Sequence, residues 1–344
     1  MIGDIIDFLR DYDGEPIKIM EVCGTHTSVI VKNGIRGLIS EKIQLISGPG
    51  CPVCVTSSTY IDRLCELLAN PETTIATFGD MMKVKGEKTS LFEAKALGAD
   101  IKILYSPMEL IELAKQNPQR NFIMAAVGFE TTAPIYSLLI ETILEEKIAN
   151  IRFLTSLKRM IPAIEYICKN ENEIDGFIAP GNVSAIIGSD AYNDLSVKYK
   201  KPFVVTGFSV NEIILSIYIL VKMKEKNINR VENIYKNVAK QNGNKNALNM
   251  LDKYFEIKDC YWRSIGIIEN SGFFIKEKYK HLCADNFSEA ADEKSAHFCS
   301  CGDIILGKIQ PTQCKLFGKT CTPENPIGPC MVSSEGSCAI FYGG

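Results

Sequence analysis

Short apolar runs alternate along the chain with segments of helical periodicity, such as 108–116 and 159–169. Near-continuous apolar strands that alternate with helices are typical of parallel sheets covered by helices on both faces. The pattern therefore predicts an α/β fold. Eight apolar runs that end at or near Gly, Pro, Ser or Asp are the predicted strands: 16–23, 42–50, 73–80, 100–107, 121–130, 150–156, 174–182 and 201–209.

The predicted strands fall into two sets of similar build. A chain of 344 residues also exceeds the size at which one core usually keeps growing. We therefore expect two similar parallel-sheet α/β domains, at 1–118 and 119–284, with a long helical stretch at 211–241 closing the second. From about residue 285 the alternation stops, and a segment rich in Cys, Gly and Pro begins. This change predicts a third domain at 285–344.

Composition narrows the class of protein. Hydrophobic residues make up 46% of the chain and charged residues 23%, which is typical of a globular protein. A net charge of -3 gives no reason to expect nucleic acid or an anionic membrane as partner. The first residues lack a basic region followed by an apolar run, and the apolar stretch 213–221 is about half of a bilayer span. We expect a cytoplasmic protein.

Thirteen cysteines are the unusual feature of the composition. In a reducing cytoplasm they indicate metal binding or thiol redox chemistry rather than structural disulfides. Three lie near the start and six in the last 46 residues. The other four are scattered, and we expect those in helix-like stretches, Cys65 and Cys168, to be small buried apolar residues.

Unusual loops follow the predicted strands, at 21–28, 47–58, 78–83, 128–134 and 179–188. In open parallel sheets, ligands bind beyond the carboxyl ends of the strands, where such loops gather. If the sheets form, Cys23, Cys51 and Cys54 come to one rim.

The stretch "GPGCPVC" admits several chemistries. Its C-x-x-C follows a strand and precedes a helix, as in a redox-active dithiol. It lacks the second pair of ligands expected of an ordinary zinc finger. Together with Cys23 and His26, however, Cys51 and Cys54 would suit iron or zinc in an open site. A histidine in such a loop is, on its own, more often a hydrogen-bonding residue than a ligand.

The tail has the spacing C-x-C-x₁₂-C-x₆-C-x₈-C-x₇-C, from Cys299 to Cys338. It contains no C-x-x-C knuckles of a zinc ribbon. An iron–sulfur cluster takes four thiolates with freer spacing, which leaves two cysteines for a redox pair. We therefore expect a C-terminal iron–sulfur domain.

Taken together, "EVCGTHT", "GPGCPVC", "GFETTAP", the Cys-rich tail and "CMVSSEGSCA" resemble the HypD family of NiFe-hydrogenase maturation factors over nearly the whole chain. The resemblance implies two α/β domains and a 4Fe-4S domain. It implies a scaffold, rather than a conventional turnover enzyme, that acts with HypC. On this scaffold iron receives two cyanides and one carbon monoxide, with the cyanide delivered by HypE. The completed group serves the NiFe-hydrogenase large subunit.

The resemblance also implies residue roles. The family's cleft cysteines correspond to Cys23, Cys51 and Cys54, with His26 in the same site. We expect Cys23, with a thiol from HypC, to hold the iron, and the hydroxyls of Thr25 and Thr27 to donate hydrogen bonds to its thiolate. Cys51 and Cys54 suit redox work or shuttling of the cyano group. The expected cluster ligands are Cys299, Cys314, Cys321 and Cys338, and the expected redox pair beside the cluster is Cys301 and Cys330.

The chain departs from the family at Asn182, where a histidine is usual. An amide can position a ligand but cannot transfer protons near neutral pH. Two other functions stay open at this stage. The first is a cluster-dependent thiol reductase that acts on a protein disulfide. The second is a binding protein whose cysteines form structural sites only.

Overall fold

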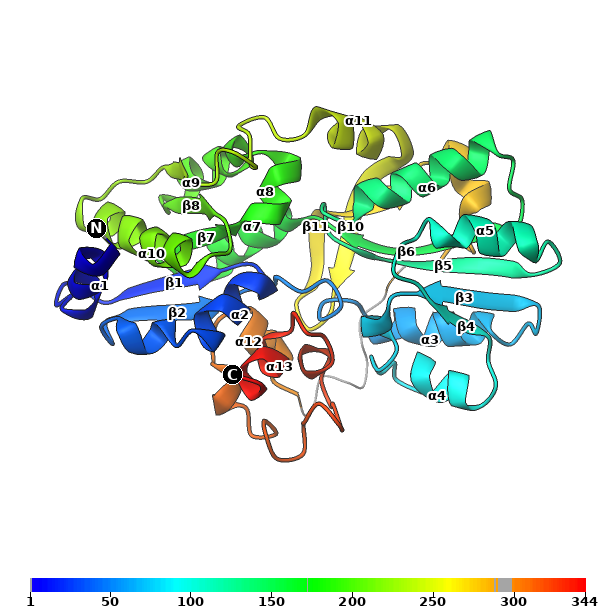
Figure 1. Cartoon of the computed structure of the whole chain (residues 1–344), viewed down its shortest axis with the longest axis horizontal. Coiled ribbons are helices and arrows are strands. Elements are labelled where there is room, and N and C mark those ends of the chain that lie inside the picture. The colour runs from blue at the N-terminus through cyan, green and yellow to red at the C-terminus, as the bar shows by residue number, and fades with distance from the viewer. Residues whose placement is uncertain (1, 172, 288, 290–298) are drawn as a thin grey trace.

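Two parallel-dominated sheets lie side by side in the computed structural model, which describes residues 2–171, 173–287, 289 and 299–344 (Figure 1). Each of the eight apolar runs contains a strand, as predicted. The first sheet, on the left of Figure 1, is parallel throughout, and it has the order β2-β1-β7-β8-β9. Its strands are β1 (Ile17–Glu21), β2 (Ile43–Ser47), β7 (Gly176–Pro180), β8 (Phe203–Thr206) and β9 (Val231–Asn233).

The second sheet has the order β10-β11-β6-β5-β3-β4. Its strands are β3 (Thr73–Thr77), β4 (Ile101–Ile103), β5 (Asn121–Gly128), β6 (Ile151–Lys158), β10 (Phe255–Trp262) and β11 (Gly266–Ile275). The four strands β3 to β6 pair in parallel, whereas β11 is antiparallel to both β6 and β10. The α/β class and the two sheets agree with the prediction.

The sheets do not follow the predicted division at residue 118. This point falls between β4 and β5, whose strands belong to the same sheet. β1 pairs with β7 from the later half of the chain, with Ile19 opposite Gly176. The chain passes from one sheet to the other after β2, after β6 and after β9. Each α/β body is therefore built from segments that are distant in sequence.

The helix expected across 211–241 is shorter than predicted. α10 (Val210–Glu225) begins with a capping box between Ser209 and Glu212. It ends where Asn227 adopts a left-handed backbone conformation with φ 51°, which breaks the helical path. The chain then forms β9 at the edge of the first sheet.

Helices cover both sheets. On the first sheet, α1 (Ile2–Arg10), α2 (Gly24–Lys32) and α10 pack on one face, over residues such as Ile19, Leu45 and Val204. On the second sheet, α5 (Glu109–Gln116), α6 (Ala133–Glu145) and α11 (Lys245–Tyr254) pack on one face. The remaining helices of the two bodies are α3 (Ser58–Leu67), α4 (Leu91–Ala96), α7 (Met160–Asn170), α8 (Gly181–Ile187) and α9 (Asn193–Tyr199), with 3₁₀ turns at Ile35–Leu38, Gly79–Met81, Ser189–Tyr192 and Glu277–Leu282.

The Cys-rich tail packs below the junction of the two bodies in Figure 1. Among the described residues of the tail, the short helices are α12 (Cys301–Ile305) and α13 (Ser337–Tyr342), with 3₁₀ turns at Pro311–Gln313 and Pro329–Met331. Ile304 and Met331 join a buried cluster that includes residues of both sheets. Ser333 Oγ donates to Asp80 Oδ2 at 3.1 Å, and Gln310 Nε2 donates to the Leu45 carbonyl at 3.1 Å. The tail therefore contacts both bodies at the rim where the unusual loops lie.

Candidate functional site

Cys23 lies where β1 gives way to α2. It is the N-cap residue of α2, in extended conformation, and its side chain is half-buried. Burial raises the pKa of the thiol to about 11, although the N–H groups of His26 and Thr25 point toward the sulfur and lower it. The thiol is therefore protonated near neutral pH until a cation displaces the proton.

One expected contact of Cys23 is wrong. The hydroxyl of Thr25 is near the sulfur, but the hydroxyl of Thr27 donates instead to Glu21 Oε1. Thr27 lies one turn into α2 and faces the end of β1, because helix geometry places residue i+4 above the N-cap. Thr27 therefore contacts the backbone carbonyl of Cys23 and the carboxyl group of Glu21, rather than the Cys23 sulfur.

Glu21 joins the two cysteine loops. Its carboxyl group is buried and accepts hydrogen bonds from the Cys23 N–H, at 3.2 Å, from the Thr27 hydroxyl and from Ser47. Ser47 is the last residue of β2 and opens the loop that carries Cys51. Burial raises the pKa of Glu21 to about 7. Glu21 was not among the predicted site residues.

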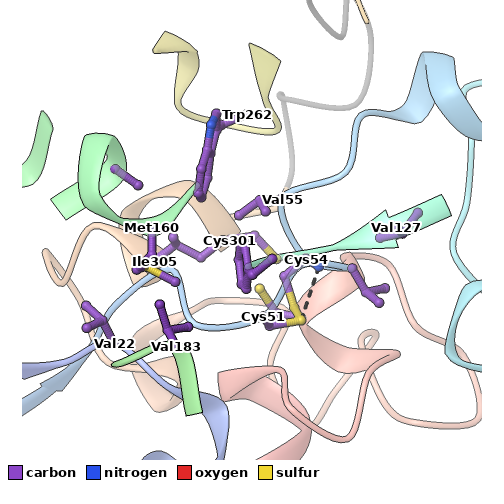
Figure 2. Close-up of a cluster of buried hydrophobic side chains, with 14 of the residues drawn as sticks. Val22, Cys51, Cys54, Val55, Val127, Met160, Val183, Trp262, Cys301 and Ile305 are labelled. Atoms are coloured by element: carbon purple, nitrogen blue, oxygen red, sulfur yellow. Dashed lines mark hydrogen bonds between the residues drawn. A yellow bond between two sulfur atoms is a disulfide. The ribbon is translucent and has the colours of Figure 1, made fainter. Parts of the chain in front are cut away.

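Cys51 and Cys54 form a disulfide with a Cα–Cα distance of 5.3 Å. Both side chains are buried, and the backbone N–H of Cys54 donates to Cys51 Sγ at 3.1 Å. Figure 2 draws this hydrogen bond within a buried cluster that also contains Cys301. The pair can therefore undergo two-electron redox chemistry inside the protein.

The disulfide loop presses against Cys23. A Cβ atom on Gly50 would lie 2.5 Å from the Cys23 Cα, a distance that real side chains do not tolerate. Only glycine permits this approach. The structure thus brings the two loops into direct contact at the carboxyl ends of β1 and β2.

A narrow cavity opens beside the disulfide. Its volume is about 10 Å³, close to the smallest space that holds one water molecule. In this conformation only very small molecules can reach the two sulfurs. The cavity is lined by Gly24, Thr27, Gly48, Pro49, Gly50, Cys51, Cys54, Ile305, Cys330, Glu335 and Ser337.

His26 is buried, and its surroundings disfavour a role as an acid–base group. Its Nε2 donates to the Gly207 carbonyl at 2.9 Å, and its ring packs on Phe208. Its Nδ1 has no hydrogen-bond partner among the described residues. Burial lowers the pKa of the imidazole to about 4, so the ring is neutral at physiological pH. His26 holds α2 against the loop after β8.

The six tail cysteines divide between two cavities. Cys330 lines the cavity of the disulfide, whereas the other five line a second cavity with apolar neighbours such as Leu316 and Phe317. The sulfurs of Cys299 and Cys301 are 3.1 Å apart, and Cys301 also forms a hydrogen bond with Cys330. A chain of sulfur atoms thus runs from the second cavity toward the disulfide. The five cysteines of the second cavity are Cys299, Cys301, Cys314, Cys321 and Cys338.

Gly328 leaves room for these sulfurs. A Cβ atom on this residue would collide with the Cys299 sulfur and would lie 2.5 Å from Cys301 Sγ. Among the described residues, no group of three or more His, Cys, Asp or Glu side chains is arranged to hold a metal ion. The thiols face one another across the cavity without forming a ready-made coordination shell.

Three other residues singled out in the sequence, Asn182, Cys168 and Cys65, lie outside the two cavities. Asn182 is exposed on the first turn of α8, which follows β7 at the same rim. Cys168 is buried, as predicted, and burial raises its thiol pKa to about 12. Cys65 is half-buried against the core. In the described ranges, no helix has the length and apolar character needed to cross a bilayer.

Comparison with known proteins gives a consistent result. A sequence model named HypD, described as "Hydrogenase formation hypA family", matches residues 2–343. Hydrogenase maturation factor HypD of Escherichia coli K12 is 39% identical over 352 residues, covering 99% of this chain and 94% of that protein. The HypD of Rhodobacter capsulatus is 38% identical, covering 96% and 90%. The HypD of Cupriavidus necator is 36% identical, covering 96% and 90%.

Proposed function

Because the chain belongs to the HypD family of hydrogenase maturation factors, we propose that it acts with HypC as the scaffold on which iron acquires its cyanide and carbon monoxide ligands. HypE is the proposed cyanide donor, and the NiFe-hydrogenase large subunit receives the product. The observation that supports this proposal is the contact between the Cys23 loop and the loop of the buried disulfide. An iron-binding thiol and a two-electron couple thereby share one rim.

Cys23 is the proposed protein ligand of the iron, which is the substrate of assembly. Its thiol is half-buried at the start of α2, where N–H groups face the sulfur and stabilise a thiolate. Iron binding would displace the proton that burial otherwise retains. A thiol of HypC would complete the holding of the metal and leave positions open for diatomic ligands.

Cys51 and Cys54 are the proposed electron source for cyanide release. Freeing cyanide from a thiocyanate on HypE requires two electrons, and it leaves a thiolate on HypE. Oxidation of one dithiol to a disulfide supplies two electrons and releases two protons. The burial of both sulfurs favours this redox role over a role in carrying the cyano group.

The tail fits a 4Fe-4S cluster by its donor set. Five thiols line one largely apolar cavity, and their crowding raises the pKa of Cys299, with Cys301 as the main cause and burial the second. Several thiolates packed in this way need a compensating positive charge. The proposed ligands are Cys299, Cys314, Cys321 and Cys338, and a cluster bound there supplies one-electron redox chemistry. Cys301 and Cys330 lie between that cavity and the disulfide.

A thiol reductase that acts on protein disulfides is the second candidate. The position of Cys330 beside the Cys51–Cys54 disulfide favours it, because the tail could then reduce the pair. A cavity of about 10 Å³ disfavours it, because a protein disulfide is bulkier than the linear thiocyanate group that the first candidate must bring to the buried sulfurs. Since the chain keeps free thiols in both regions, we place either activity in a reducing compartment, the cytoplasm.

The decisive experiment is infrared spectroscopy of the chain purified anaerobically with HypC. Bands of iron-bound cyanide and carbon monoxide are expected, and Cys23→Ala should abolish them. Cys65→Ala is the matched control, because Cys65 is also half-buried but lies on α3. Bands that persist in full in Cys23→Ala would show that another group holds the iron. A complex without such bands in the unmodified chain, but with disulfide reductase activity, would favour the second candidate.

A further inference from the structure

A third, larger pocket lies at the junction of the two α/β bodies. Its volume is about 560 Å³, which is within the range of small-molecule sites, and junctions between domains are favoured places for such sites. On one side it is bounded by the end of α8 and the turn at Ser189–Tyr192. On the other side it is bounded by the start of α7, by α11 and by the β10–β11 hairpin. No cysteine is among its lining residues.

Most of the pocket wall is apolar. Phe255, Phe273 and Leu251 are buried at its base, and Ile257 is 46% exposed at its rim. Ile187 brings an apolar side chain from the opposite body. The wall therefore favours the hydrocarbon part of a ligand.

One end of the pocket is polar, and it contains a buried oxygen atom that lacks a hydrogen-bond partner among the described residues. Glu130, only 2% exposed, lines the pocket and accepts the Met160 N–H at Oε1, at 2.8 Å. Its Oε2 is buried and has no hydrogen-bond partner among the described residues. Burial raises the pKa of Glu130 to about 7, so that near neutral pH a large fraction carries a proton it can donate. A buried oxygen without a partner is costly, and a ligand could satisfy it.

Arg159 supplies a positive charge at the same end. Its Nη1 donates to the Asn270 carbonyl at 2.6 Å, and its guanidinium lies 5.8 Å from the Phe273 ring centroid. Within the described part of the chain, no carboxylate lies at ion-pairing distance from Arg159. The other N–H groups of the guanidinium can therefore pair with an anion.

We propose that this pocket binds a small molecule that has an apolar body and a single carboxylate. The carboxylate accepts hydrogen bonds from Arg159 and from protonated Glu130, while the body contacts Phe255, Phe273 and Ile187.

Of the other charged lining residues, Asp252 pairs with Lys276 and Glu256 pairs with Lys258. A cationic ligand would be repelled by Arg159, and an uncharged one would leave the guanidinium without an ion-pairing partner. The proposal is independent of the maturation function and of every thiol in the chain.

The test is calorimetric titration of the full chain with octanoate, 1-octanol and octylamine. Octanoate should bind at one saturable site, at least tenfold more tightly than octanol, and octylamine should bind least. Equal affinity for octanoate and octanol would overturn the proposal, as would the absence of saturable octanoate binding.

Variants separate the charge from the apolar wall. Arg159→Gln should weaken octanoate at least tenfold and leave octanol unchanged. Arg152→Gln is the control, because Arg152 lies on β6, the strand that leads to Arg159, and its side-chain hydrogen bonds go to backbone carbonyls outside the pocket. Ile257→Glu should weaken the binding of both octanoate and octanol. Because the Ile257 side chain is partly exposed, the variant should remain folded. Unchanged octanoate affinity in Arg159→Gln would assign binding to another surface and overturn the proposal.

Discussion

The backbone N–H of Cys54 donates a hydrogen bond to the sulfur of Cys51, at 3.1 Å. The hydrogen bond makes the two sulfurs of the disulfide unequal. After reduction, the same N–H stabilises a thiolate on Cys51, whereas Cys54 Sγ lies 3.9 Å from the carbonyl oxygen of Pro329, which disfavours negative charge. In the reduced pair, the backbone contacts therefore favour negative charge on Cys51 over Cys54.

This asymmetry predicts selective alkylation. In the reduced protein, iodoacetamide should modify Cys51 several times faster than Cys54 during the local openings of the loop that admit the reagent, because thiolates are the reactive form and the hydrogen bond lies within the loop itself. Peptide mass spectrometry at short reaction times measures the ratio. Denatured protein is the control, in which the preference should disappear. A folded protein that is alkylated first at Cys54 would contradict the assignment.

Glu21 should contribute to the free energy of unfolding through the buried hydrogen bonds that it accepts. Glu21→Ala removes the acceptor for the Cys23 N–H and for the Thr27 hydroxyl, which leaves buried donors without partners. We expect a loss of about 3 kcal/mol in the free energy of unfolding, measured by urea denaturation. Glu21→Gln retains an acceptor and should lose clearly less. If both variants are as stable as the unmodified chain, Glu21 does not hold the two loops together.

Glu130 should make stability depend on pH. Its folded pKa of about 7 lies above the ordinary value of 4.5, so the folded state binds the proton more tightly than the unfolded state. This contribution is fully present below pH 4.5 and is lost as the pH rises through about 7. It amounts to as much as about 3 kcal/mol.

Glu130→Gln should remove this contribution. Between pH 4.5 and pH 8, the unmodified chain should lose up to about 3 kcal/mol more unfolding free energy than the variant. Urea denaturation at the two pH values measures the difference, and any constant cost of the substitution cancels. The half-buried Glu256, which lines the same pocket, provides the control in Glu256→Gln, which should keep the original pH dependence. Equal pH dependence in Glu130→Gln and the unmodified chain would contradict the raised pKa.

The tail cysteines predict a specific metal content. Anaerobically purified protein should contain about four irons and four sulfides per chain. Cys321→Ser should lose both the iron and the sulfide, because Cys321 lines the second cavity with the other four thiols. Circular dichroism of this variant should show that the α/β bodies are still folded. Cys65→Ser, outside this cavity, should retain them. Stoichiometric zinc without iron in anaerobic preparations would contradict the cluster.

The strands were predictable because most of them are buried on both faces. β3, β5 and β7 are almost entirely buried, so their sequences are continuous apolar runs. β10 was not predicted, because Lys258 and Asp259 in its middle are exposed and interrupt the apolar pattern. The strand lies at the edge of its sheet. Strand order was not predictable from local patterns, because the pairing of β1 with β7 depends on packing between distant segments.

Of the candidate site, the cysteines could be predicted from the sequence, whereas the buried carboxyl groups could not. Thiols and glycines are rare enough to stand out at strand ends, and Cys23 and Cys51 were found in this way. Glu21 and Glu130 were missed because a carboxylate beside an apolar run normally marks the solvent-exposed end of a strand. Only the three-dimensional structure shows that both side chains are buried.

The exchange of strands between the two bodies has a consequence for biosynthesis. During translation, β1 and β2 leave the ribosome long before β7, and Lys18 meets its partner Asp175 only 157 residues later. Until then, the edge of β1 that β7 will occupy is unpaired, and such edges favour aggregation. Contacts of this sequence separation also slow folding, because a long loop must close before they form. We therefore expect a nascent chain of this protein to be most prone to aggregation before β7 has been synthesised.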